Sequence, residues 1–207
     1  MSGQTKRIVV VGGSFNPPTK AHQAIMKAAM QCISADTGIF VPSSDAYVRR
    51  KMSKSNRDNQ VYSENERVQM LLCCADLHVD VNTVEFGDDG KGHTYETLCE
   101  IQKENPDSEI WFVVGDDKLN IMTRWRNHDE LLDRFRFVVL TRGATDVRSI
   151  IRNNKILNRY ENHFRVCKSP KDIDNISSTE CRKLINAKEW AKLKAYMDEK
   201  VIAYLKM

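Results

Sequence analysis

The sequence predicts an α/β fold: a parallel β-sheet with helices on both faces, followed by a C-terminal helical segment. Its most hydrophobic runs are short and rich in β-branched residues, which is typical of buried parallel strands. These runs alternate with segments of helical periodicity. No internal repeat, low-complexity tract or linker divides the 207 residues. We therefore expect a single domain over residues 1–207, with a helical portion at 179–207.

The expected strands differ in how their patterns indicate burial. Continuous apolar runs predict strands that are buried on both faces, at 7–11, 39–41, 110–114 and 137–140. Residues 79–85 alternate between apolar and polar side chains, which predicts a strand with one buried face. Residues 164–167 show a weaker apolar pattern and complete the set of expected strands.

Helices are expected between the strands, where apolar residues recur at helical spacing. Ser63 and Glu66 form a capping-box pattern, which predicts a helix that begins there and continues to Ala75. Further helices are expected at 22–34, 94–103, 118–122, 129–135, 148–162 and 179–206, the last as one or two helices. The polar stretch 43–65 carries several Lys and Arg residues and is expected to be a loop.

Composition and charge narrow the class of protein. The formal net charge of +4 is mild, and basic residues are interleaved with acids, which favours anionic small molecules over nucleic acid as partners. No apolar run approaches the roughly 18 to 20 residues of a membrane span, and the polar N-terminus predicts no signal peptide. The six cysteines lack zinc spacing, so we expect reduced thiols, a cytoplasmic protein and no protein-bound metal.

The segment behind the first strand is typical of a phosphate-binding loop. Gly12 and Gly13 let the backbone approach a ligand closely, and the next helix points its N–H groups and positive dipole end at the same place. Thr19 and His22 lie one turn apart, so both side chains can face one ligand. A tight β-to-α turn with a structural histidine is the alternative, but the combination favours phosphate binding.

A second anion-binding pattern lies at residues 176–182. An ordinary helix N-cap is the alternative interpretation, because Ser and Thr are preferred there. Ser178 and Thr179 add hydroxyls to the exposed N–H groups of a helix start, and Arg182 adds a permanent positive charge one turn later. Two such helix starts suit a triphosphate that is cut between its phosphates.

Together these segments resemble the nicotinate and nicotinamide mononucleotide adenylyltransferases, within the nucleotidyltransferase superfamily of class I aminoacyl-tRNA synthetase-like fold. The family pattern G-[ST]-F-[ND]-P-x-[TH]-x-x-H matches residues 13–22, and I-S-S-T-x-x-R matches 176–182. The resemblance implies a Rossmann-like sheet and a cytoplasmic enzyme of NAD biosynthesis. Such an enzyme transfers the adenylyl group of ATP, with Mg²⁺ on its phosphates, to the mononucleotide and releases pyrophosphate.

The resemblance also implies roles for individual residues. The catalytic set would be His22, Thr19 and Arg182. ATP would be bound by Gly13, Ser14, Phe15, His22, Asp117, Ile176, Ser178, Thr179 and Arg182. The acceptor would be bound by Asn16, Tyr47, Arg50, Lys51, Thr94, Trp125 and Arg142.

The acceptor residues come from shorter matches. Residues 93–98 resemble [YH]-T-x-x-T-L, 115–119 resemble G-x-D-x-L with Asp117 as the acid, and Arg67 begins a family R-x-x-M pattern. Because the segment 51–67 is longer than usual in the family, Arg50 and Lys51 are equal candidates for its phosphate-binding base. For each match, a solvated loop, a helix cap or a core tryptophan is the alternative.

Two other functions remain open at this point. One is an adenylyl- or cytidylyltransferase that uses another phosphorylated acceptor, such as phosphopantetheine. The other is a non-catalytic nucleotide-sensing module, which would have no need of the intact histidine, hydroxyl and arginine groups. The sequence leaves nicotinate or nicotinamide open, and the resemblance allows a homo-oligomer, because family members range from dimers to larger rings.

Overall fold

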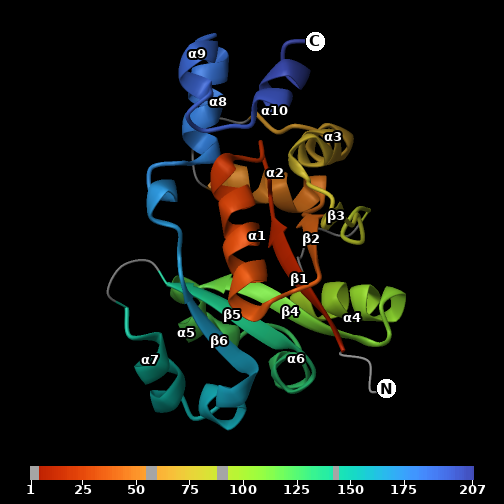
Figure 1. Cartoon of the computed structure of the whole chain (residues 1–207), viewed down its shortest axis with the longest axis vertical. Coiled ribbons are helices and arrows are strands. Elements are labelled where there is room, and N and C mark those ends of the chain that lie inside the picture. The colour runs from red at the N-terminus through yellow and green to blue at the C-terminus, as the bar shows by residue number, and fades with distance from the viewer. Residues whose placement is uncertain (1–4, 55–59, 88–92, 142–144) are drawn as a thin grey trace. The chain divides into compact units, whose positions relative to one another are not determined.

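The computed structural model describes residues 5–54, 60–87, 93–141 and 145–207 (Figure 1). Its strands form a six-stranded sheet in the order β3-β2-β1-β4-β5-β6. The strands are β1 (Lys6–Gly13), β2 (Thr37–Pro42), β3 (Val79–Val81), β4 (Ser108–Gly115), β5 (Arg136–Thr141) and β6 (Phe164–Lys168). The predicted α/β fold with a parallel sheet is confirmed.

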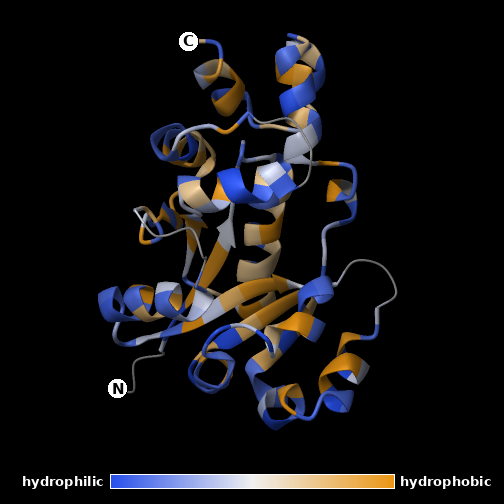
Figure 2. Cartoon of the chain, turned by 180° about the vertical axis from the view of Figure 1, so that it is seen from behind, coloured by the Kyte–Doolittle hydropathy of each residue, from blue (hydrophilic) through white to orange (hydrophobic). Residues whose placement is uncertain are grey.

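The central strands form the most deeply buried part of this sheet. Strand β1 pairs in parallel with β4, β4 with β5, and β5 with β6, so that Val9 lies opposite Trp111 and Val113 opposite Val138. The side chains of Val9 and Val138 are fully buried. Burying one such aliphatic side chain stabilises the fold by roughly 1.5–3 kcal/mol. Figure 2 shows these strands mostly in the hydrophobic colour.

The helices largely follow the predicted pattern. They are α1 (Lys20–Ile33), α2 (Asp45–Lys54), α3 (Glu64–Cys74), α4 (Thr94–Glu104), α5 (Leu119–Met122), α6 (His128–Arg134), α7 (Val147–Asn153), α8 (Ser178–Asn186), α9 (Trp190–Leu193) and α10 (Glu199–Tyr204), with short 3₁₀ helices η1 (Asp116–Lys118), η2 (Leu157–His163) and η3 (Lys171–Ile173). The predicted capping box is confirmed, because the Ser63 hydroxyl accepts from the Glu66 N–H while the Glu66 carboxylate accepts from the Ser63 N–H. None of the helices in the described ranges combines the length and apolarity that crossing a membrane requires.

The predicted loop over 43–65 is wrong in part, because Asp45–Lys54 forms helix α2. The Ser44 hydroxyl accepts a hydrogen bond from the Tyr47 N–H at 3.3 Å, which supports the first turn. Val48 is the buried residue of this helix. A helix that buries so little carries too weak an apolar period for sequence analysis to detect.

Three other expected elements are shorter or divided. Strand β3 ends early in the predicted range 79–85, because Asn82 Oδ1 accepts from a backbone N–H two residues later and forms a turn. The helix expected at 148–162 breaks at Asn154, whose side chain accepts two later backbone N–H groups. The C-terminal segment forms three helices rather than one or two, and Lys188, with φ of +56°, lies after the first.

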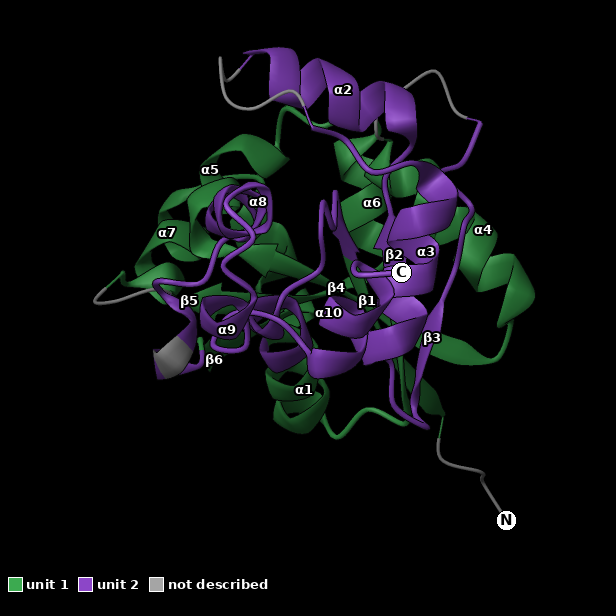
Figure 3. Cartoon of the chain, turned by 90° about the horizontal axis from the view of Figure 1, so that it is seen from above, with its two compact units in different colours: residues 1–11, 25–39, 93–169 green, residues 12–24, 40–92, 170–207 purple. Residues whose placement is uncertain are grey.

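The chain divides into two compact units, which alternate along the sequence (Figure 3). Unit 1 comprises residues 1–11, 25–39 and 93–169, and unit 2 comprises 12–24, 40–92 and 170–207. The single domain expected from the sequence stays a prediction.

Unit 1 contains a disulfide that the sequence analysis did not expect. Cys32 of α1 and Cys167 of β6 are bonded, with Cα atoms 6.4 Å apart and 135 positions apart in sequence. The expectation of six reduced thiols is therefore wrong, because folding joins two cysteines whose spacing carries no pairing signal. The free cysteines in the structure are Cys73, Cys74, Cys99 and Cys181.

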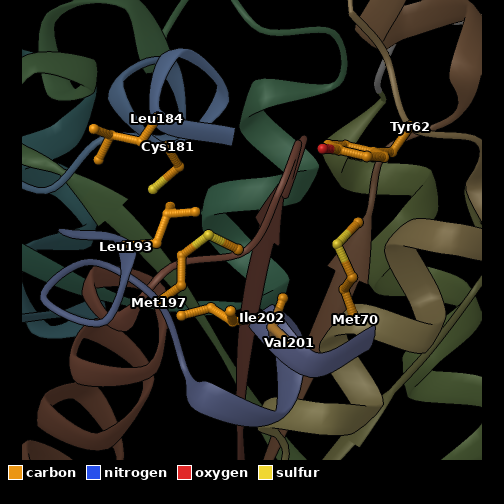
Figure 4. Packing of buried hydrophobic residues seen from close by; sticks show 8 residues of the cluster. All are labelled: Tyr62, Met70, Cys181, Leu184, Leu193, Met197, Val201 and Ile202. Carbon is orange, nitrogen blue, oxygen red and sulfur yellow. The ribbon is translucent and has the colours of Figure 1, made fainter. Parts of the chain in front are cut away.

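Unit 2 has an apolar cluster that joins α3 to the C-terminal helices (Figure 4). Figure 4 shows the side chains of Leu193 and Met197 between those of Cys181 and Ile202. The cluster consists of Tyr62, Met70, Cys181, Leu184, Leu193, Met197, Val201 and Ile202. It anchors α3 and α8, the two helices whose arginines donate to the backbone carbonyls of Ser14 and Asn16.

Candidate phosphate-binding site

The candidate phosphate-binding loop, residues 13–19 of unit 2, begins where β1 ends. The Ser43 N–H donates to the Gly13 carbonyl at 2.9 Å. A Cβ at position 13 would lie 3.2 Å from the Phe15 ring, so the close approach favours glycine. Phe15 has φ of +43°, which is unusual for an aromatic residue. Its buried ring makes edge contacts with the rings of His22 and Phe40, at centroid distances of 5.0 and 5.3 Å, which hold this conformation.

Asn16 connects this loop to the rest of unit 2. Its side-chain oxygen accepts from the Tyr62 N–H, and its side-chain nitrogen donates to the Gln60 carbonyl, both at 2.9 Å. The Asn16 backbone carbonyl accepts from Arg182 Nη1 at 2.6 Å. Asn16 is only 2% exposed, and its side-chain amide bonds to other protein groups in this structure. The resemblance implies instead that Asn16 binds the acceptor.

The contacts of His22 determine which of its ring nitrogens carries the proton. The Thr19 N–H donates to His22 Nδ1 at 3.0 Å, and the Thr19 hydroxyl lies 2.9 Å from the same atom. Since Nδ1 accepts a hydrogen bond, the neutral ring carries its proton on Nε2. Desolvation and then the charge of Lys51 lower the pKa of His22 to about 4. At neutral pH, His22 is therefore an uncharged donor through Nε2.

Helix α2 brings Lys51 to the loop. Its Nζ atom donates to Ser14 Oγ at 3.2 Å, and its charge acts on His22. The guanidinium of Arg50 instead lies over the Tyr47 ring, 5.7 Å from the centroid. From the sequence, Arg50 and Lys51 are equal candidates for the phosphate-binding base. The structure places Lys51 beside the loop, because the register of a helix puts adjacent residues on different faces.

The second predicted anion-binding segment meets the first loop within unit 2. The Ser177 hydroxyl accepts from the Glu180 N–H and so caps the N-terminus of α8. An ordinary helix N-cap was the alternative interpretation of residues 176–182. Ser178 Oγ donates to the Pro17 carbonyl at 2.8 Å. Arg182 is 2% exposed and also contacts Thr179 Oγ1, at 3.4 Å. The start of α8 therefore supports the phosphate loop directly.

Three more of the predicted site residues belong to unit 1. Asp117 is exposed and pairs with the neighbouring lysine, and a Cβ at Gly115 would lie only 2.5 Å from its carboxylate oxygen. Thr94 is the first residue of α4 and is half-buried, as is Trp125. Arg142 lies outside the described residues. Ile176, of unit 2, donates its N–H to the Ile173 carbonyl.

One residue of the site had no predicted role. Arg67 of α3 is fully buried, and its Nη1 atom donates to the Ser14 carbonyl at 3.0 Å. In the sequence it was only a match to R-x-x-M. An arginine that shares a helix face with the buried Met70 and Leu71 is the signal that could have indicated an internal partner.

Comparison with known proteins assigns the family. The model of the family described as cytidylyltransferase-like matches residues 10–184, which include both candidate phosphate-binding segments. The chain belongs to the cytidylyltransferase-like family. This cytidylyltransferase-like chain is 29% identical over 189 residues to a Fusobacterium nucleatum protein named "Probable nicotinate-nucleotide adenylyltransferase", covering 88% of this chain and 89% of that protein. A Listeria monocytogenes protein of the same name is 27% identical over 202 residues, with 97% and 94% covered.

A solved structure has the same fold as this cytidylyltransferase-like chain. It is the Plasmodium falciparum nicotinic acid mononucleotide adenylyltransferase complexed with NaAD. The TM-score is 0.64 at 19% identity, with 97% of this chain and 94% of that chain covered. The Rossmann-like α/β fold implied by the resemblance is confirmed.

Proposed function

We propose that the chain is a nicotinate-nucleotide adenylyltransferase of NAD biosynthesis. It transfers the adenylyl group of ATP to nicotinate mononucleotide, and it releases deamido-NAD and pyrophosphate. The observation that carries the proposal is the arrangement within unit 2, where His22, Lys51 and the first turn of α8 all contact the loop 13–19. The names of the bacterial relatives favour nicotinate over nicotinamide as the base of the acceptor.

The reaction needs positioning and charge stabilisation rather than a protein nucleophile. An oxygen of the acceptor phosphate bonds to the α-phosphorus of ATP in line, and the bond from that phosphorus to the bridging oxygen breaks. The electron pair leaves with pyrophosphate. His22 donates from Nε2 to a phosphate oxygen, and Lys51 offsets the developing negative charge. Thr19 keeps Nδ1 occupied and so holds the ring in this orientation.

Mg²⁺ enters this scheme with its substrate. Among the described residues, no three His, Cys, Asp or Glu side chains gather as a cluster that could hold a metal ion. The ion is proposed to arrive on the phosphates of ATP, because Mg²⁺ commonly binds substrate phosphates and keeps several waters. When bound, it neutralises phosphate charge during transfer.

The other assignments remain proposals. Gly13, Ser14 and Phe15 line the ATP phosphates. The start of α8, with Ser178 and Thr179, faces the leaving pyrophosphate. Arg182 holds the loop in place and adds positive charge. Asp117 binds the ribose of ATP, and the acceptor is bound by Tyr47, Lys51, Thr94, Trp125 and Arg142. We propose a cytoplasmic enzyme whose partners are ATP and the mononucleotide, and a homo-oligomer stays a prediction.

Pyrophosphate release tests the proposed function. Purified protein with ATP and Mg²⁺ is given nicotinate mononucleotide, nicotinamide mononucleotide or phosphopantetheine in parallel. We expect the fastest release with nicotinate mononucleotide. Release with phosphopantetheine alone would mean that phosphopantetheine, and not a pyridine mononucleotide, is the acceptor. If the protein binds ATP but releases no pyrophosphate with any of the three acceptors, the proposed catalysis is contradicted.

A further inference from the structure

The fully buried guanidinium of Arg67 links three segments of unit 2. Its Nε atom donates to the Tyr62 carbonyl at 3.1 Å, Nη1 to the Ser14 carbonyl at 3.0 Å and Nη2 to Asp45 Oδ1 at 3.0 Å. Its carbon Cζ also lies 5.9 Å from the centre of the Phe86 ring. Each nitrogen of the guanidinium therefore has an acceptor on a different segment.

The segments that Arg67 joins are those that carry the candidate chemistry. Ser14 belongs to the phosphate loop, and its hydroxyl accepts from Lys51. Asp45 is the first residue of α2, the helix that carries Lys51. Tyr62 lies before α3, and its N–H donates to Asn16 of the same loop. One side chain thus fixes both ends of the contact between Lys51 and Ser14.

The chemistry of these contacts requires an arginine. A buried charge is costly to desolvate, and a single carboxylate, with 30% of its side chain exposed, seldom makes such a pair stabilising overall. Arginine keeps its proton and presents a rigid planar fork of donors, whereas lysine is a point charge on a flexible chain. A lysine at position 67 could not keep three acceptors in three directions at once.

We propose that Arg67 is a positioning residue for adenylyl transfer, which holds helix α2 and the phosphate loop in the register that places Lys51 beside Ser14 and His22. The inference rests on the proposed function. It assigns Arg67 no contact with substrate, and its effect passes through Lys51.

The first test uses the protein without substrate and reads the position of Lys51 from the titration of His22 by NMR. Because the charge of Lys51 contributes to the low pKa of His22, Lys51→Met should raise that pKa. Arg67→Lys should raise it as well, and Lys51→Met added to Arg67→Lys should raise it little further. A titration that Arg67→Lys leaves unchanged would overturn the proposal.

The second test is a double-mutant cycle on kcat/KM for ATP. Arg67→Lys should lower kcat/KM on the order of tenfold, as a small misplacement of a catalytic group does. Lys51→Met should cost much less in the Arg67→Lys background than in the wild type. If the effects of the two substitutions simply multiply, Arg67 acts independently of Lys51, and this result would overturn the proposal.

Two further variants control for folding. Arg49→Ala removes an exposed arginine that lies 3.9 Å from the same Asp45 carboxylate, and it should leave kcat/KM near the wild-type value. Asp45→Asn weakens the link to α2 without leaving a cavity, so it tests the same coupling if Arg67→Lys does not fold. If the wild type makes no dinucleotide, the proposed function fails, while the His22 titration still decides the role of Arg67.

Discussion

The strands of unit 1 and the phosphate loop of unit 2 are stabilised by different forces. In unit 1, β5 buries a continuous apolar run at residues 137–140, and β4 buries Ile110, Trp111 and Val114. The hydrophobic effect that stabilises these strands has no preferred direction. In unit 2, the loop is held by directional hydrogen bonds to buried polar groups, namely Asn16, Arg67 and Arg182. The first region stabilises the fold, and the second orients the side chains of the candidate site. Substitutions in the first should therefore lower the free energy of unfolding, and substitutions in the second should lower the catalytic rate.

The largest effect on stability is expected in β5. Phe137 is fully buried and stacks on Phe164 at 5.2 Å, so Phe137→Ala should lower the free energy of unfolding by about 3–5 kcal/mol. Chemical denaturation measures this change. The folded fraction should keep its kcat, and a large loss of kcat in that fraction would contradict the separation of the two roles.

The pH dependence of stability should reveal the lowered pKa of His22. Its pKa is about 4 in the folded protein and about 6.5 when unfolded, so the unfolded chain binds the proton first as the pH falls. Stability should therefore fall between about pH 6.5 and pH 4, by up to about 3 kcal/mol from this group. Urea denaturation of the wild type and of His22→Gln at several pH values isolates this contribution. If the free energy of unfolding changes equally with pH in both proteins, the pKa of His22 is not lowered in the folded state.

The largest effect on catalysis is expected at His22. His22→Ala should lower turnover on the order of a hundredfold, because a hydrogen bond to the reacting phosphate is lost. Steady-state pyrophosphate release measures it. His78→Ala is the matched control, since His78 is exposed in the same unit and should tolerate the change. Near-normal turnover of His22→Ala would remove the proposed role.

A smaller effect distinguishes the two basic residues of α2. Lys51→Met should lower kcat/KM for ATP on the order of tenfold, as the loss of one charge–phosphate contact does. Arg50→Met, which removes the contact with the Tyr47 ring, should change it much less. The reverse ranking in the same kinetic assay would mean that α2 presents its other face to the substrate.

Local patterns in the sequence predicted much of this molecule. The apolar runs predicted β1, β4 and β5, since a buried parallel strand is recognisable from its own residues. The capping box at Ser63 predicted the start of α3, and the loop pattern singled out Thr19 and His22. Each of these features depends on residues that are close in sequence.

Features that depend on distant contacts were not predicted. The bond between Cys32 and Cys167 and the internal acceptors of Arg67 arise only when remote segments meet. Helix α2 buries only Val48, so its polar sequence resembled a loop, and the choice between Arg50 and Lys51 required its register. Directional polar contacts leave little periodicity in a sequence, and this is why unit 2 was harder to predict than the strands of unit 1.

The measurement that tests the central claim most directly follows the label of ATP into products. ATP labelled at the α-phosphate or at the γ-phosphate is incubated with the protein, Mg²⁺ and nicotinate mononucleotide. The account predicts that the α-label appears in the dinucleotide and the γ-label in pyrophosphate. A γ-label in a phosphorylated acceptor, or an α-label that remains in free AMP or ADP, would contradict adenylyl transfer.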